Sequence, residues 1–450
     1  MTPTDIDPEL KEAILKKIEK EKVRFIEMQF SDILGTVKSV SIPADKADRA
    51  MEEGVFIDGS SILGYTTIEE SDMRTMPILE SFQIYPWTAN GSAKTARFMC
   101  KIYDHNGKRF KGDPRLVLEN AMAKAKEMGM NFNVGPEFEF FLFKLDENNG
   151  PIPVVADAGG YFDLMPMDEG EKVRKDIMLQ FDEMGFDVEA GHHEVAPGQH
   201  EVDLRYNDAL TVADRMMTLK FGVKTIAVSH GYHATFMPKP VFGENGSGMH
   251  VHQSLTIEGK GNVFDDPNGE FGLSENAFKY IGGLLNHIGS ACAITNAYVN
   301  SYKRLVPGYE APCYISWANM NRSALIRVPA GRGARARVEL RNPDPAGNPY
   351  LQFAVMLAAG MDGIKNGIYP PEPVEKDIYK MGAAERKELG IDSLPGNLGE
   401  ALAAMSESKL IRETLGDHIF EHYLHLKGCE WDEFRTYVTD WEIKKFLPIL

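Results

Sequence analysis

Four segments of the sequence alternate charged or metal-liganding residues with apolar ones, and this two-residue period is that of a β-strand. They are residues 135–141, 192–205, 246–254 and 337–341. In the first segment, Glu137 and Glu139 point the same way, about 6–7 Å apart along the backbone, and Phe138 and Phe140 face the other side. Strongly apolar sequence flanks these strands, and a buried, unpaired carboxylate is too costly to keep ionised. The fold must therefore give each charged face water, a counter-ion or a metal.

The other three segments carry the same types of residue. In 192–205 a Pro197-Gly198 turn separates Glu194 from Glu201. The charged or metal-liganding faces comprise Glu201, Asp203 and Arg205; His250, His252 and Ser254; and Arg337, Glu339 and Arg341. Each segment alone is more typical of a half-exposed sheet strand with one polar face. Taken together, converging glutamates with a histidine, and no thiolates, favour hard divalent cations such as Mg²⁺ or Mn²⁺.

Seven arginines fall between positions 304 and 341 of a chain whose formal net charge is −17. The net charge argues against nucleic acid as a partner, because phosphate backbones need positive surface. The arginines are Arg304, Arg322, Arg327, Arg332, Arg335, Arg337 and Arg341. Alone, such a cluster is more often a solvated ion-pair surface, although guanidinium forks also match phosphate and carboxylate. With the acidic strands it indicates a multi-metal site for phosphoryl transfer or hydrolysis, and the acceptor stays open.

The 450 residues are enough for two domains or one very large one. The pattern predicts a small α+β domain with a helix over 8–22 and strands over 23–30, 36–42, 82–87 and 97–103. Helices over 114–128, 171–184, 208–229 and 274–290 then alternate with short strands. The polar N-terminus and the lack of an apolar run of about 18 residues predict neither a signal peptide nor a membrane span. Four widely separated cysteines favour a reducing, cytoplasmic location.

Seven strings, read together, resemble the type I glutamine synthetases from about residue 20 to the C-terminus. They are D-G-S-S-I-L-G at 58–64, I-E-E-S-D-M at 68–73, G-P-E-F-E-F-F-L-F at 135–143, H-H-E-V-A-P-G-Q-H-E at 192–201, F-M-P-K-P-V-F-G-E-N-G-S-G-M-H at 236–250, S-Y-K-R-L-V-P-G-Y-E-A-P at 301–312 and N-P-D-P-A-G-N-P-Y-L at 342–351. The resemblance implies an α+β fold. It comprises an N-terminal β-grasp domain over 1–104 and a large catalytic domain over 105–450, in which helices wrap a curved antiparallel sheet.

The resemblance also implies roles for particular residues of this sequence. One metal site would use Glu139, Glu194 and Glu201, and a second would use Glu137, His250 and Glu339, so that each active site holds two or more Mg²⁺ or Mn²⁺ ions. Arg304 and Arg341 would bind substrate carboxylates, beside the backbone of Asn245 and Gly246. Arg322 and Arg327 would contact the phosphates of ATP, and Glu189, His252 and Ser254 would lie near the nucleotide.

The implied reaction forms glutamine from glutamate and ammonia in two steps. The γ-carboxylate of glutamate attacks the γ-phosphoryl group of ATP, and ammonia then displaces phosphate from γ-glutamyl phosphate. Asp58 and Glu310 would capture and deprotonate ammonium, and Glu310 would also close over the intermediate. Asp58 would complete the site of a neighbouring subunit, which implies a dodecamer of two stacked hexameric rings. Apart from that context, D-G-S at 58–60 is typical of a turn.

Two positions bear on regulation. Thr67 replaces the arginine that usually precedes I-E-E-S-D in relatives inhibited by glutamine, so we expect weak or absent glutamine feedback through that route. Tyr379 lies near the position of an adenylylated tyrosine in one subgroup, but the acidic motif around it is missing, so we expect no such modification. The chain thus resembles the shorter, non-adenylylated subtype, some members of which are activated by 2-oxoglutarate and bind PII-type proteins.

Three rival interpretations stay open at the level of sequence. A γ-glutamyl-amine ligase would keep the metal and ATP residues but take a larger amine. A non-enzymatic homologue would serve as an interaction protein, and a metal-dependent hydrolase is the interpretation that the residues alone support. His192 is as consistent with a structural histidine as with a substrate role.

Overall fold

The N-terminal part is a six-stranded sheet carrying two helices. The computed structural model describes residues 6–66, 71–89 and 93–450. The strands are β1 (Phe25–Ser31), β2 (Val37–Pro43), β3 (Val55–Asp58), β4 (Asp72–Pro77), β5 (Gln83–Ile84) and β6 (Thr95–Tyr103), in the order β2-β1-β6-β4-β3, with β5 on β6. Helices α1 (Pro8–Lys20) and α2 (Ala47–Glu53) cover it. Ile14 and Ile18 of α1 pack on Ile26, Met28 and Phe98 of the sheet.

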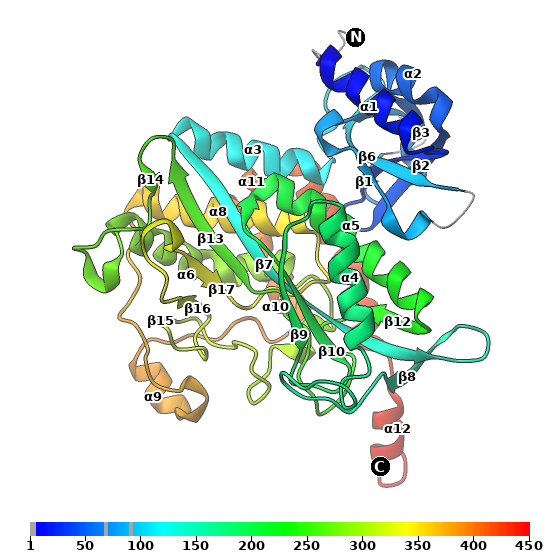
Figure 1. Ribbon diagram of the computed structural model, residues 1–450. Helices are drawn as coiled ribbons and strands as arrows, with labels where there is room; N and C mark the ends of the chain where they lie inside the picture. Colours follow the sequence, from blue (N-terminus) through cyan, green and yellow to red (C-terminus); the bar gives the residue numbers. More distant parts are fainter. Residues whose placement is uncertain (1–5, 67–70, 90–92) are drawn as a thin grey trace.

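The second part is built on an 11-stranded sheet in the order β15-β16-β17-β13-β7-β10-β9. Its strands are β7 (Met130–Leu145), β8 (Pro151–Val155), β9 (Val188–His193), β10 (Gln199–Leu204), β11 (Asn207–Asp208), β12 (Tyr232–Thr235), β13 (Val251–Ile257), β14 (Gly261–Asn262), β15 (Trp317–Asn319), β16 (Ile326–Val328) and β17 (Val338–Leu340). The long strand β7 runs diagonally through Figure 1 and pairs with β13, β10, β12, β11 and β8. The expected antiparallel sheet is confirmed except at β15–β16, which is parallel.

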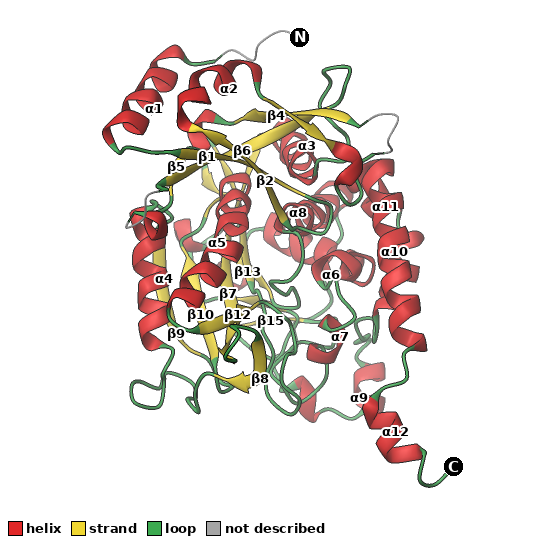
Figure 2. Ribbon diagram, turned by 90° about the vertical axis from the view of Figure 1, so that its right-hand side faces the viewer, coloured by secondary structure: helices red, strands yellow, loops and turns green. Residues whose placement is uncertain are grey.

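Helices cover this sheet and one another (Figure 2). They are α3 (Pro114–Glu127), α4 (Glu171–Glu183), α5 (Ala209–Ser229), α6 (Glu275–Thr295), α7 (Ser301–Arg304), α8 (Pro349–Asn366), α9 (Ala383–Glu388), α10 (Leu398–Ser406), α11 (Lys409–Thr436) and α12 (Asp440–Phe446). Phe138 and Phe140 are fully buried in the core beneath them. The charged side chains of β7 are thereby directed to the other face of the strand.

Most expected elements are present, and the α+β class is confirmed. The strand expected over 82–87 is only β5, because Pro86 lacks the N–H that a sheet ladder requires and starts a 3₁₀ turn, Pro86–Thr88. The helix expected over 274–290 continues to Thr295. Within the described residues, the structure contains no helix with both the length and the apolar character needed to cross a bilayer.

Asn348 ties the two parts of the chain together. Its Nδ2 donates to the carbonyl oxygens of Asp32, at 3.1 Å, and of Ile33, at 3.3 Å. Its Oδ1 accepts from the backbone N–H of Tyr350 and so caps the start of α8. Gly35 packs so closely on Asn348 that an added Cβ would lie 2.7 Å from its Cα. The buried side-chain amide of Asn348 therefore both caps the start of α8 and holds the residues after β1 against the second part of the chain.

Candidate active site

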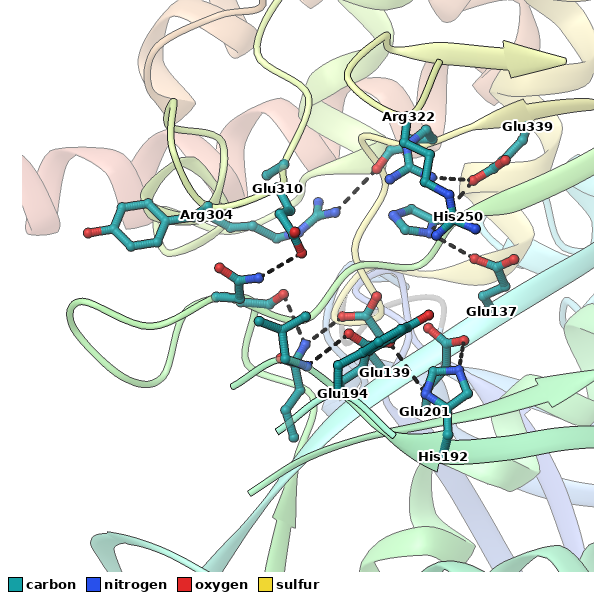
Figure 3. A pocket seen from close by; sticks show the side chains of 18 of the residues that line it. Glu137, Glu139, His192, Glu194, Glu201, His250, Arg304, Glu310, Arg322 and Glu339 are labelled. Atoms are coloured by element: carbon teal, nitrogen blue, oxygen red, sulfur yellow. Dashed lines mark hydrogen bonds and ion pairs between the residues drawn. The ribbon is translucent and has the colours of Figure 1, made fainter. Parts of the chain in front are cut away.

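The predicted metal ligands and arginines line a single cavity of about 520 Å³ (Figure 3). The residues come from β7, the β9–β10 hairpin and the segment before β13. The others come from α7 and the loop after it, from β16 and the segment before it, and from β17 and the residue that follows it. From the set singled out in the sequence, the cavity gathers Glu137, Glu139, Glu194, Glu201, Asn245, Gly246, His250, Arg304, Glu310, Arg322, Arg327, Glu339 and Arg341. Residues separated by up to about two hundred positions thus meet in one cavity.

The first group of ligand atoms is the His250 cluster, made of Glu137, His250 and Glu339. One ligand atom from each residue lies within 4.8 Å of the others. His250 Nδ1 lies 2.8 Å from Glu137 Oε2 and 3.8 Å from Glu339 Oε1. Glu137 also accepts a hydrogen bond from His252 Nε2 at 2.9 Å. The Nδ1 of His252 in turn accepts from Arg337. This is the set that the resemblance assigns to the phosphate side of the site.

The second group is the His192 cluster, made of His192, Glu194 and Glu201, again within 4.8 Å. His192 Nε2 lies 3.1 Å from Glu201 Oε1, and its Nδ1 lies 3.5 Å from Glu194 Oε1. The resemblance assigns Glu139, rather than His192, to this set. Glu139 lines the same cavity, but its Oε2 accepts from Gln199 Nε2, at 2.7 Å, and from the N–H of Gly248, at 2.8 Å. His192 thus occupies the position beside Glu194 and Glu201 that the resemblance gives to Glu139.

Four carboxyl groups of the cavity, here called the acidic wall, have raised pKa values: Glu139, Glu194, Glu201 and Asp203. Burial, reinforced by neighbouring carboxylates, raises the pKa of Glu194 to about 8 and that of Asp203 to about 7. Burial also raises the pKa of Glu139 to about 7 and that of Glu201 well above its usual range. Burial alone would raise the pKa of Glu137 too, but hydrogen bonds with its histidines lower it. Carboxylates crowded in this way are good ligands for hard cations, which would replace the protons.

Arginines line the same cavity and pair with one of the acidic clusters. Nη1 of Arg341 donates to Oε1 of Glu339 at 2.6 Å, and Arg327 also pairs with this fully buried carboxylate. The buried Nε of Arg341 has no hydrogen-bond partner among the described residues. Arg322 bonds the hydroxyl of Tyr161. An anionic group that enters the cavity would therefore meet guanidinium donors that lie next to the carboxylate of Glu339.

The loop 306–312 closes one side of the cavity. Glu310 Oε2 accepts from Asn245 Nδ2 at 3.0 Å, and Glu310 has a left-handed backbone with φ of 57°. The ammonium group of Lys239 lies 3.7 Å from the centre of the Tyr309 ring. Gly246 approaches the carbonyl of Pro238 so closely that an added Cβ would lie 2.1 Å away. The loop therefore rests on the segment 238–246 through two side-chain contacts.

A second hollow of about 590 Å³ adjoins the first and shares Glu137 and Asp203 with it. It is lined by Glu189, His252 and Ser254, the three residues expected near a nucleotide, and by Arg335 and Arg337. Both hollows lie on the charged face of β7. The arrangement offers two connected subsites whose shared wall carries Glu137.

Some expected residues lie elsewhere. Arg205 was placed on the face of Glu201 and Asp203, but β10 ends at Leu204, and Arg205 is exposed and lies 3.6 Å from Asp187. Asp58 is exposed at the end of β3, where its side chain caps a 3₁₀ turn by accepting from Ser60 N, and it does not line this cavity. Thr67 lies outside the described residues. Sequence reasoning missed Tyr161, Tyr309 and Lys239, which lie outside the four alternating segments, and Gln199, which lies in the turn region of 192–205 and carries no charge.

Comparison with known proteins identifies the family. The family model of the glutamine synthetase β-Grasp domain matches residues 22–105, and that of the glutamine synthetase catalytic domain matches 111–446. A glutamine synthetase of Clostridium saccharobutylicum is 54% identical over 437 residues, which is 97% of this chain and 98% of that protein. A glutamine synthetase of Methanosarcina mazei is 53% identical over 440 residues, covering 98% of each chain.

Solved structures agree in fold. A GmaS/ADP complex superimposes with a TM-score of 0.88 at 30% identity, covering 96% of this chain and 99% of that one. Apo GmaS without ligand superimposes with a TM-score of 0.86 at 31% identity, with the same coverage. Two domain models matched in order, full-length relatives above 50% identity and a shared fold together establish that this chain belongs to the glutamine synthetase family.

Proposed function

We propose that this chain is a glutamate–ammonia ligase, which forms glutamine, ADP and phosphate from glutamate, ammonia and ATP through γ-glutamyl phosphate. The observation that carries the proposal is that one cavity gathers two acidic–histidine clusters together with Arg304, Arg322, Arg327 and Arg341. Such a site can neutralise the charge that is shared between a phosphoryl group and a carboxylate. The names of the relatives at 51–54% identity supply the acceptor.

Divalent cations fit the two clusters. Carboxylate oxygens and imidazole nitrogens suit Mg²⁺ or Mn²⁺. Burial, together with neighbouring carboxylates, raises the pKa of Glu194 and of Glu201, and a bound cation would offset the negative charge that is unfavourable there. Glu137, His250 and Glu339 would hold one cation, and Glu194 and Glu201, with His192 or Glu139, the other. When bound, these cations supply Lewis-acid stabilisation of phosphoryl oxygens and of the attacking carboxylate.

The protein side chains orient both substrates. The second hollow, with Glu189, His252 and Ser254, accommodates the nucleotide, which agrees with the ADP named for one solved relative. Arg322 and Arg327 stabilise the transferring phosphoryl group. Arg341, with its unpaired Nε, is suited to a substrate carboxylate, beside the backbone of Asn245 and Gly246.

Arg304 has less freedom, because its guanidinium donates to the carbonyl oxygens of Arg341, Asn342 and Pro343. We propose that it mainly fixes the position of Arg341 and contacts the substrate with its remaining edge. The loop with Glu310 excludes water from the acyl phosphate.

Ammonium capture requires carboxylates, and we assign it to Glu310 with Asp58 of a neighbouring subunit. The exposure of Asp58, away from the cavity of its own chain, supports this division between subunits. Apolar side chains on and after α12 support assembly as well, because Trp441, Leu447, Ile449 and Leu450 are 60–98% exposed where the C-terminus projects from the body. We propose a homo-oligomer, and the dodecamer of two hexameric rings is its specific form.

We further propose the non-adenylylated subtype. The Tyr379 hydroxyl donates to the carbonyl of Ala311, at 2.7 Å, so it is engaged within the fold, next to Glu310. Thr67 predicts weak glutamine feedback. Activation by 2-oxoglutarate and binding of a PII-type protein are the regulatory alternatives that the resemblance suggests.

The testing experiment measures phosphate and glutamine formation with ATP, Mg²⁺, glutamate and ammonium, each omitted in turn. We expect turnover only with all four present, and little effect of added glutamine. Glu339→Gln removes a ligand oxygen and should abolish turnover, whereas Asp362→Asn, on α8 and outside the cavity lining, should not. Phosphate release without glutamate would indicate a hydrolase, and turnover with methylamine or a polyamine but not ammonium would indicate a γ-glutamyl-amine ligase.

A further inference from the structure

A buried polar network lies behind the His192 cluster, on the other face of the β9–β10 hairpin. Strand alternation directs His192 and Glu201, which are paired across the hairpin, into the cavity. It directs His193 and His200, the next pair, away from the cavity. The side chains of His193 and His200 are fully buried there with those of Asp157 and Asp168. The same two strands therefore carry ligands on one face and this network on the other.

Asp157 fastens the turn that links Glu194 to Glu201. Its Oδ1 accepts from His193 Nε2 at 3.0 Å and from the backbone N–H of Gly198 at 2.8 Å. His193 in turn donates from Nδ1 to the carbonyl oxygen of Glu194 at 2.6 Å. One carboxylate and one imidazole thus hold both ends of the turn and contact the backbone of a predicted ligand directly.

Arg174 completes the network from α4. It donates to His200 Nδ1 and to Asp168 Oδ2, both at 2.8 Å. A guanidinium only donates, so His200 Nδ1 must accept, and its Nε2 carries the proton.

This protonation matters because ligand atoms of Asp157, Asp168, His193 and His200 lie within 4.8 Å of one another, as they would around a metal. A protonated Nε2 and an adjacent guanidinium oppose a cation there. Within the network, the positive charges of Arg174 and of His193, both of whose ring nitrogens donate, instead balance the negative charges of Asp157 and Asp168.

Glycines fix the two imidazole rings. A Cβ at Gly170 would lie 2.3 Å from His200 Nε2, and one at Gly159 would lie 2.7 Å from His193 Nε2. Gly170 has a right-handed backbone, with φ of −79° and ψ of −7°, so alanine would be opposed there by the ring alone and not by the backbone. The network is therefore packed as well as hydrogen-bonded.

We propose that Asp157 and His193, with His200 and Arg174 behind them, are positioning residues that set the cation affinity of the His192 cluster. The inference rests on the proposed function in taking Glu194 and Glu201 as metal ligands. Groups that hold ligands from behind commonly change metal affinity by about 10–100-fold when they are lost. The network acts on the ligand backbone rather than on the cation.

The test is a titration of the full-length protein with Mn²⁺, without substrates, that follows free Mn²⁺ by electron paramagnetic resonance. We expect the unmodified protein to bind two classes of Mn²⁺. Asp157→Asn places an amide N–H against a donor, so one class should weaken by about 10–100-fold while the other is unchanged. Gly170→Ala, which keeps every polar group, should weaken the same class by a smaller factor. Asp362→Asn breaks a similar pair, His287 Nε2 to Asp362 Oδ2 at 2.8 Å, and should change neither class.

Thermal unfolding of each variant shows whether it is folded, so that weaker Mn²⁺ binding can be told apart from loss of structure. If Asp157→Asn is unfolded, the Mn²⁺ affinities of Gly170→Ala test the proposal instead. Folded variants whose two Mn²⁺ affinities both equal those of the unmodified protein overturn the proposal. So does loss of a whole class in Asp157→Asn while Glu194→Gln retains it, because the network would then be the metal site. If Glu194→Gln and Glu201→Gln leave Mn²⁺ binding intact, the ligand assignment itself fails. If those two weaken binding and the network variants do not, only the positioning role fails.

Discussion

Cation binding at the acidic wall should depend steeply on pH, because the ligands hold protons that a cation must displace. The pKa of Glu194 is raised to about 8 and that of Glu139 to about 7, with burial as the largest cause. At pH 7 a group with a pKa of 8 is about nine-tenths protonated, and one with a pKa of 7 is half protonated. Binding at that pH should therefore release between one and two protons from these two residues, and Glu201 adds to this number.

The magnitude follows from the proton count. Each released proton makes the apparent affinity about tenfold stronger per pH unit, so Mg²⁺ or Mn²⁺ affinity should rise roughly 10–100-fold between pH 6.5 and 7.5. Calorimetry in two buffers of different ionisation enthalpy measures the proton number directly. Glu194→Gln, which cannot ionise, should bind the cation more weakly and release about one proton fewer at pH 7. Release of no protons by the unmodified protein would refute the reasoning.

The same groups set the stability of the metal-free protein. Native Glu194 keeps its proton to about pH 8, whereas an unfolded glutamate loses it near its ordinary value of 4.5. Between these values the native state binds more protons, so the free energy of unfolding should fall as pH rises, by up to about 1.4 kcal/mol per pH unit for each such carboxyl. Added Mg²⁺ should therefore raise the unfolding temperature more at pH 8 than at pH 6, and an equal effect at both would contradict this linkage.

Three further outcomes are expected. Asp214→Asn should lower the free energy of unfolding by about 1–3 kcal/mol in urea, because buried Arg115 loses one of its two 3.0 Å hydrogen bonds with Asp214 and keeps Glu119 as its carboxylate partner; a loss below about 0.5 kcal/mol would count against this. Lys239→Met removes the cation above the Tyr309 ring, a contact worth about 0.5–2 kcal/mol. The ratio of ATP consumed to glutamine formed should therefore rise, whereas Lys239→Arg should keep it low; equal ratios would exclude a role in closing the loop. Deleting 437–450 removes the exposed apolar C-terminus and should shrink the assembly in sedimentation, and an unchanged size would show that this segment is not an interface.

The two-residue period of 135–141 was enough to predict that Glu137 and Glu139 lie opposite Phe138 and Phe140, because strand geometry alone separates the two faces. It could not predict which residues share a cluster. The pairing of His192 with Glu201 depends on the register of the β9–β10 hairpin, and that of His250 with Glu339 on contact between strands nearly ninety residues apart. The family resemblance supplied the distant partners that local pattern does not contain.

Other features depend on where a side chain is directed within the fold. The side chain of Arg304 is of the type that binds a substrate carboxylate, yet its guanidinium donates to three backbone carbonyls. Tyr161 lies outside the alternating segments and Gln199 is an uncharged residue within one of them, so only the folded cavity reveals their place in the site. Hydrogen-bond competition of this kind is decided by tertiary contacts, and sequence patterns are silent on it.

Because β7 carries Glu137 of the His250 cluster and also Glu139, which is paired across the sheet with Glu201 of the His192 cluster, a single strand sets the interval between the two centres. Loops that surround the cavity can gain or lose residues during evolution without altering that interval. One inserted residue in 135–140 would instead exchange the faces of the strand, burying glutamates and exposing phenylalanines. Descendants of such a scaffold are free to vary the amine that they accept, but they inherit the distance between their two charged centres unchanged.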